Sequence, residues 1–281
     1  MKLSLCNEVL GSIPLEDQCQ LAARLGYEGL EIAPFTLAEA PEHIDGAEAR
    51  RLRGVIETSG LVCTGLHWLL VKPTGLSVTD PDPAVRERTL EVVKHHIALC
   101  AELGGRVMVH GSPRQRQVAP GESQETARAR LVAFLHAAGE VAAQHGITYC
   151  LEPLARRETT LVNTVAEAVD VVREIGLDSV RTMIDCSAAG ATENESVPEL
   201  IERWMPSGLI AHIQVNDPNR RAPGQGEMRF APILAALERH RYSGVVAVEP
   251  FDYIPDGPGC AAWAAAYLRG VQEGLSHGPG A

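Results

Sequence analysis

The feature that most constrains the fold of this chain is a regular alternation of short apolar runs with longer segments of helical periodicity. The apolar runs lie at 3–9, 29–34, 62–70, 106–111, 148–153, 181–186, 210–216 and 245–250. Apolar residues recur at helical spacing over 14–25, 47–59, 84–103, 122–145, 164–175, 197–205, 230–240 and 260–274. Strands that alternate with helices in this way form parallel sheets that are buried on both faces.

Eight such units in a chain of 281 residues predict an α/β fold, the (β/α)8 TIM barrel, which typically needs about 250 residues. No segment is rich enough in Pro, Gly or Ser to act as a linker. We therefore expect a single catalytic domain over residues 1–275 and a C-terminal tail over 276–281. The first run is not followed by a Gly-x-Gly-x-x-Gly motif, which argues against an open dinucleotide-binding sheet.

Composition excludes several classes of partner. The formal charge of −11 and the scattered Lys and Arg residues disfavour nucleic acid. The apolar runs are too short to cross a membrane, and the first residues show no signal peptide, so we expect a cytoplasmic protein that does not bind membranes. The seven cysteines form no Cys-x-x-Cys pair, which disfavours disulfides and thiolate metal sites.

Each apolar run carries a polar residue at or near its C-terminal end. In a TIM barrel these ends form the floor of the active site, so the side chains should converge there. The residues are Asn7, Glu31, His67, His110, Glu152, Asp185, His212 and Glu249. A polar side chain satisfied locally explains any single one of them, whereas the joint pattern favours a functional site.

Four of these residues, Glu152, Asp185, His212 and Glu249, come from successive strands. Three carboxylates that lie close together raise one another's pKa values unless a cation neutralises them. A site of oxygen and nitrogen ligands suits one divalent ion, Mn²⁺ in the first place and otherwise Mg²⁺ or Co²⁺. The alternative is an internal salt-bridge network with arginine as the cation.

Aromatic and imidazole side chains are placed to contact a ligand at the barrel mouth. His67 and Trp68 end the third run, and Phe251 and Tyr253 follow the eighth. We expect His67 and Trp68 to contact the substrate, and His110 to donate a hydrogen bond to a substrate hydroxyl or to a glutamate. Packing beneath neighbouring loops is the alternative for all of these residues.

Several motifs resemble those of the xylose-isomerase-like sugar isomerase/epimerase superfamily. They are "LEPLARRET" on the fifth strand, "IDC" on the sixth, "AHIQVND" and "NRRAPGQGE" at the seventh, and "VEPFDY" on the eighth. The likeness covers nearly the whole chain. It is nearest to the ketose 3-epimerases of the tagatose/psicose type, with the hydroxypyruvate isomerases close by.

The resemblance implies roles for particular residues. It makes Glu152, Asp185, His212 and Glu249 the metal ligands, and Glu152 and Glu249 also the acid/base pair. It also implies that Glu158 and Arg220 hold the O1/O2 end of a carbohydrate substrate. Members of the superfamily often form homodimers or homotetramers, so the resemblance implies such an assembly here.

The expected chemistry is epimerisation or isomerisation of a small keto-sugar or sugar derivative. Removal of a proton α to a carbonyl gives an enediolate, which a metal stabilises as a Lewis acid while two glutamates exchange protons with the sugar. One departure from the family pattern bears on the substrate. Ala188 stands where the ketose epimerases carry a histidine that contacts the carbonyl end of the sugar. The sequence thus favours familiar chemistry on a different sugar.

Three other functions remain open at this stage. A metal-dependent lyase or dehydratase acting on a keto-sugar, a cyclitol ketone or an oxidised glycoside would begin with the same proton abstraction. An apurinic endonuclease shares the barrel, but Asn219-Arg220-Arg221 replaces its Asp-Arg-His motif and the chain is acidic. A non-catalytic sugar-binding barrel would have no need of the acid/base pair.

Overall fold

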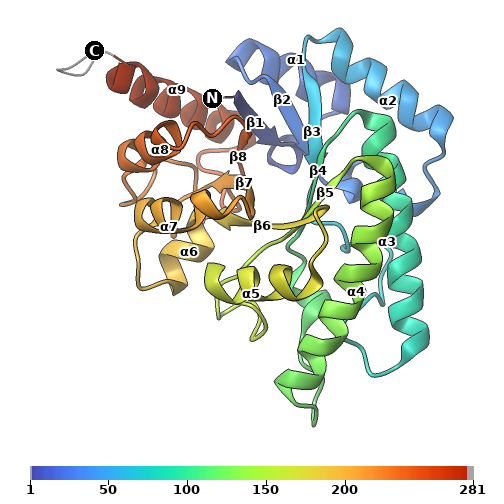
Figure 1. Ribbon diagram of the computed structural model, residues 1–281. Helices are drawn as coiled ribbons and strands as arrows, with labels where there is room; N and C mark the ends of the chain where they lie inside the picture. The colour runs from blue at the N-terminus through green and yellow to red at the C-terminus, as the bar shows by residue number, and fades with distance from the viewer. Residues whose placement is uncertain (1, 277–281) are drawn as a thin grey trace.

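The computed structural model describes residues 2–276, which form a closed barrel of parallel strands surrounded by helices (Figure 1). The strands pair in sequence order, and β8 closes the barrel against β1. Their bounds are β1 Lys2–Cys6, β2 Gly29–Ile32, β3 Val62–Leu66, β4 Val107–His110, β5 Thr148–Leu151, β6 Val180–Asp185, β7 Ile210–Val215 and β8 Val245–Val248. The predicted TIM barrel is confirmed.

Helices connect the strands and cover the outside of the barrel (Figure 1). They are α1 Leu15–Leu25, α2 Gly46–Thr58, α3 Pro83–Leu103, α4 Gln124–His145, α5 Val165–Ile175, α6 Cys186–Thr192, α7 Val197–Trp204, α8 Phe230–Arg239 and α9 Gly257–Ser276. Most of the predicted tail, residues 276–281, lies outside the described residues, and Ser276 is the last residue of α9. In residues 2–276 no helix combines the length and apolar character needed to span a membrane.

Local sequence signals set the helix boundaries. Helix α1 follows Pro14 and ends at Gly26, whose φ of 82° is the left-handed conformation that glycine adopts most easily. Helix α5 starts with a capping box, in which Thr164 and Glu167 satisfy each other's backbone N–H groups. The connections from helices to the following strands are short, such as 26–28 between α1 and β2, whereas those from strands to helices, such as 152–164 before α5, are longer.

Two expected strands, β1 and β3, end three and four residues earlier than predicted, because the chain turns at the barrel mouth. After β1, residues Asn7–Leu10 form the short 3-10 helix η1 instead of continuing the strand. After β3, Trp68 adopts a φ of 51°, which no extended strand allows. Helix α6, which the sequence did not predict, begins directly after β6, where the Asp185 side chain accepts a hydrogen bond from the Ala188 backbone N–H.

A layer of polar side chains spans the interior of the barrel. Glu31 on β2 contacts both His212 and Gln214 on β7, although β1 and β8 separate these two strands in the sheet. The contacts therefore cross the inside of the barrel. The outward side chains of the strands belong instead to the apolar core beneath the helices, as Leu30, Tyr149 and Val215 do. This polar interior supports the functional residues at the carboxyl ends of the strands.

Candidate active site

Three buried carboxylates meet at the carboxyl end of the barrel. Glu152 follows β5, Asp185 ends β6 and Glu249 follows β8, and one oxygen from each lies within 4.8 Å of the others. These residues are only 6%, 4% and 4% exposed. The sequence placed all three at one point, and the fold brings them together. Carboxylates this close and this buried repel one another, which calls for a compensating cation.

Asp185 is held in place by hydrogen bonds on both oxygens. Its Oδ1 accepts from the Ala188 backbone N–H at 2.7 Å, and its Oδ2 accepts from Asn216 Nδ2 at 2.8 Å. Burial raises the pKa of Asp185 to about 6, a rise that these two hydrogen bonds limit. Asn216 also donates to the Glu249 backbone carbonyl at 2.9 Å, so one amide group fixes two of the carboxylate positions.

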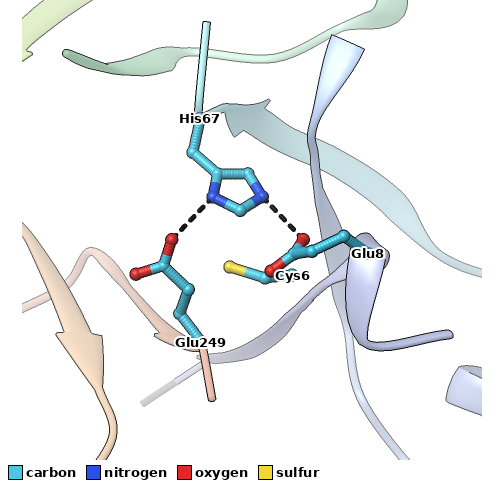
Figure 2. A group of neighbouring side chains, drawn as sticks. All are labelled: Cys6, Glu8, His67 and Glu249. Atoms are coloured by element: carbon cyan, nitrogen blue, oxygen red, sulfur yellow. Dashed lines mark hydrogen bonds and ion pairs between the residues drawn. The ribbon is translucent and has the colours of Figure 1, made fainter. Parts of the chain in front are cut away.

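Glu249 belongs to a buried hydrogen-bond network in which His67 lies between Glu249 and Glu8 (Figure 2). His67 Nδ1 lies 2.9 Å from Glu249 Oε1, and His67 Nε2 lies 2.9 Å from Glu8 Oε2. Figure 2 shows the imidazole between the two carboxylates, with the Cys6 thiol beside the same ring. His67 therefore contacts Glu249 directly and holds its Oε1 atom in place.

The groups around His67 stabilise its protonated form. Burial lowers the pKa of His67, but Cys6, Glu8 and Glu249 outweigh that effect, so its pKa stands well above the ordinary value. Burial raises the pKa of Glu249 to about 8, and His67 opposes the rise. Glu249 Oε2 has no hydrogen-bond partner among residues 2–276. One oxygen of Glu249 is thus fixed by His67, and the other is available.

Glu152 has a different setting. Burial, together with the charges of Glu249 and Asp185, raises the pKa of Glu152 well above its usual range, and Arg116 opposes the rise. Arg116 is completely buried, and its Nε and Nη2 atoms have no hydrogen-bond partner in the described chain. Burial lowers the pKa of Arg116 to about 10, while Glu152 and Glu158 work against that shift. The guanidinium is therefore a buried cation on the Glu152 side of the site.

The predicted ligand His212 does not lie with the three carboxylates. Its Nε2 is 2.8 Å from Glu31 Oε2, in an ion-pair contact deeper in the barrel. Gln214, two residues further along β7, is the Cα partner of Asp185 on β6. Two residues of parallel strand span roughly 6.6 Å, which accounts for the different depths of these two side chains. Gln214 Nε2 donates to Glu31 Oε1 at 2.9 Å, and its buried Oε1 has no partner within residues 2–276.

His110 lies on the outer surface of the barrel instead of at its mouth. Its Nδ1 is 2.9 Å from the Tyr149 hydroxyl, and its ring packs 5.8 Å from the ring of Phe134 on α4. Burial lowers the pKa of His110 to about 3, and the charge of Arg116 adds to the shift. The expected contact with a substrate is therefore not seen, because the side chain points toward the helix layer.

A cavity of about 510 Å³ opens over the carboxylates. Glu152 and Glu249 lie in its wall, together with Trp68, Glu158 and Arg220 from the predicted substrate-binding set. Arg220 Nη1 lies 3.3 Å from Glu158 Oε1, so these two charges already form a pair. Ala188 is buried, and its backbone N–H, not its side chain, serves the site through Asp185.

Sequence reasoning missed several residues that build this site. Glu8 and Arg116 stood in no motif, and Gln214 and Asn216 lay within the motif "AHIQVND" without an assigned role. The period of two along β7 was a usable signal, since it puts residues 212, 214 and 216 on one face. Nothing in the local sequence marks Glu8 or Arg116, because both follow strands as parts of short turns.

With this geometry established, comparison with known proteins identifies the family. Residues 19–271 match the family described as xylose isomerase-like TIM barrel, and the chain belongs to it. D-psicose 3-epimerase from Agrobacterium fabrum is 29% identical over 234 residues, which cover 82% of this chain and 76% of that protein. 3-Dehydro-D-guloside 4-epimerase from Escherichia coli is 23% identical over 266 residues, which cover 89% and 92% of the two chains.

Solved structures show the same fold. A D-psicose 3-epimerase crystallised in the presence of D-fructose superposes with a TM-score of 0.82 at 23% sequence identity. The alignment covers 96% of this chain and 99% of the epimerase. The barrel described above is therefore shared over its full extent with an enzyme of the ketose 3-epimerase type.

Proposed function

We propose that this protein is a metal-dependent epimerase or isomerase of a small keto-sugar or sugar derivative. The observation that carries the proposal is the cluster of three buried carboxylates, Glu152, Asp185 and Glu249, of which Glu152 and Glu249 line an open cavity. Relatives that are named as sugar epimerases support it. Glu152 and Glu249 are the proposed acid/base pair, exchanging protons with the sugar by way of an enediolate.

The residues present fit a divalent metal ion. Glu249 Oε2 and Gln214 Oε1 are buried oxygens without partners in the described chain, and the three carboxylates leave negative charge uncompensated. We assign the ion to Glu152, Asp185 and Glu249, with the amide oxygen of Gln214 in place of His212. An all-oxygen set suits Mn²⁺ or Mg²⁺. When bound, the ion supplies Lewis-acid stabilisation of negative charge on the substrate.

The protein's own groups perform the proton transfers in this proposal. Glu152 and Glu249 follow strands that are three positions apart around the barrel, so they approach a substrate from different sides. One carboxylate removes the proton from the carbon next to the carbonyl, and the other returns a proton. Return to the opposite face of the same carbon gives an epimer, and return to the neighbouring carbon gives an isomer. Arg220 and Glu158 bind hydroxyl groups at the rim.

The test is solvent deuterium exchange with the Mn²⁺-loaded protein. A panel of ketohexoses, ketopentoses and keto-glycosides is incubated in D₂O and followed by NMR and mass spectrometry. We expect deuterium at one carbon and an epimer or isomer of the substrate. Replacing Glu152 or Glu249 by Gln should lower the rate at least about 10²-fold, the usual contribution of a general acid or base.

Glu87→Gln is the matched control, because Glu87 is exposed on α3. It should keep the wild-type rate. Absence of exchange across the whole panel with the metal-loaded protein would overturn the proposal. Release of water or of an aglycone would instead identify elimination.

A further inference from the structure

Three aromatic rings form a continuous wall on one side of the cavity. We call Phe35, Trp68 and Phe251 the aromatic arc. The centroids of Phe35 and Trp68 are 5.7 Å apart, as are those of Trp68 and Phe251. The three residues follow β2, β3 and β8, so separate parts of the chain build the wall. All three line the cavity that contains Glu152 and Glu249.

The backbone at this wall adopts conformations that bulky residues rarely take. Trp68 has a φ of 51° and Arg220 a φ of 72°, both in the left-handed region. Arg220 is clamped there, because its carbonyl accepts hydrogen bonds from the backbone N–H groups of Phe251 and Asp252 at 2.8 and 2.9 Å. Unfavourable conformations persist where the surrounding structure enforces them, and they concentrate at functional sites.

Arg220 extends the arc on its far side. Its guanidinium carbon lies 4.6 Å from the centroid of Phe251, within range of a cation–π contact. The Arg220 charge is also paired with Glu158, and the carboxylates of the floor lie close by. This side of the cavity therefore offers flat apolar and stacking surfaces to a neutral group, not an uncompensated cation to an anion.

The cavity has the size of a ligand-binding pocket. Its volume of about 510 Å³ lies within the range of roughly 300–1,000 Å³ that holds drug-sized ligands. Val71, which is 39% exposed, continues the apolar surface beyond Trp68. When the reacting sugar lies over Glu152 and Glu249, the arc faces whatever group is attached to it.

We propose that the aromatic arc is a subsite for a second ring, and that the substrate is a keto-glycoside instead of a free ketose. This inference rests on the proposed function and specifies its substrate class. The second ring is neutral and presents an apolar face to Trp68. An aromatic aglycone and a second sugar share this chemistry.

The experiment compares three substrates that differ only in the attached group: methyl, phenyl and glucosyl 3-keto-β-D-glucopyranosides. We expect wild-type kcat/KM to be at least about tenfold higher for the phenyl or the glucosyl compound than for the methyl compound, since a ring packed on an aromatic side chain contributes on that scale. A phenyl preference assigns the subsite to an aromatic aglycone, and a glucosyl preference assigns it to a sugar.

Variants test whether the arc causes the preference. Trp68→Leu should reduce the ring-to-methyl ratio of kcat/KM to about twofold or less, and Phe35→Leu should reduce it in part. The matched control is Trp263→Leu, because Trp263 is 51% exposed on α9. Its ratio should stay at the wild-type value. The subsite proposal is wrong if wild type shows a ring-to-methyl ratio of kcat/KM near one for both the phenyl and the glucosyl compound. It is also wrong if neither Trp68→Leu nor Phe35→Leu changes that ratio.

Binding measured without turnover separates the two proposals. Saturation-transfer NMR with the phenyl compound should show contact at the phenyl protons for wild type and weaker contact for Trp68→Leu. Binding of this kind without deuterium exchange in any substrate would reject the proposed function and keep the subsite. Exchange at equal rates in all three substrates would reject the subsite alone.

Discussion

The two proposed acid/base glutamates occupy opposite kinds of surroundings. Glu249 is held by an imidazole that bridges to Glu8, and the contacts at both ring nitrogens measure 2.9 Å. No hydrogen bond holds the side chain of Glu152 in the described part of the chain, where Arg116 supplies charge without a direct contact. His67 thus sets the orientation of Glu249, whereas no side-chain hydrogen bond among residues 2–276 sets that of Glu152.

His67 and His110, two of the buried histidines, also have unlike surroundings. His67 has its pKa raised well above the ordinary value, because Cys6, Glu8 and Glu249 outweigh burial. His110 has its pKa lowered to about 3 by burial, with Arg116 as a further cause. His67 contacts Glu249 and the charge of Arg116 acts on Glu152, so we expect the two glutamates to play different parts in the reaction.

The largest expected effect comes from replacing His67, which lies between Glu8 and Glu249. His67→Leu leaves Glu8 and Glu249 as buried carboxylates without a partner, which costs about 3–5 kcal/mol of unfolding free energy. Urea unfolding of the metal-free protein at neutral pH measures this loss. His67→Gln, which keeps a donor, should recover part of it and part of kcat.

His136→Leu on α4 is the control, since the His136 side chain is 48% exposed and its ion pair with Glu140 spans 3.8 Å. Surface pairs of this kind contribute at most about 1 kcal/mol. Equal losses of unfolding free energy in His67→Leu and His136→Leu would show that the contacts of His67 do not hold Glu249 in place.

A smaller effect is expected on the Glu152 side. A Cβ at position 111 would lie 1.6 Å from Glu152 Oε2, so Gly111→Ala must displace that carboxylate. Misplacement by about 1 Å can lower kcat about 10²-fold. Stability should fall by only about 1–3 kcal/mol, because Glu152 has room to move into the cavity.

Gly54→Ala serves as the matched control. Among residues 2–276, nothing lies within 4 Å of a Cβ at position 54, which is exposed on α2. Its activity should equal that of wild type. Full activity in Gly111→Ala would mean that the position of Glu152 is not critical.

The last effect is absent at neutral pH and develops only in acid, because it arises from the titration of His110. Its folded pKa of about 3 is below the ordinary value of 6.5, so the unfolded chain binds the proton more tightly. Stability is therefore complete above pH 6.5 and declines as the pH falls toward 3, by at most about 1.4 kcal/mol per pH unit for this group. His110→Gln should flatten the urea-unfolding stability profile in that window. An unchanged slope would contradict the assignment.

Much of the site followed from the sequence because strand ends in a parallel barrel share one edge. Glu152, Asp185 and Glu249 could be placed together from three motifs and a count of strands. His212 and His110 were harder, since both are polar residues near strand ends. A shift of two residues changes depth in the barrel, and a shift of one changes the face. Only the register showed that Gln214 pairs with Asp185.

The sequence by itself determined the barrel, the carboxylate floor and the family motifs, since alternating periodicity and strand-end polarity are local properties. The tertiary structure decided which residues surround the three carboxylates and line the cavity. Glu8 meets His67 across 59 positions of the chain, and Phe251 meets Trp68 across 183. Contacts of this kind depend on how β1, β3 and β8 close around the barrel, and no local pattern encodes them.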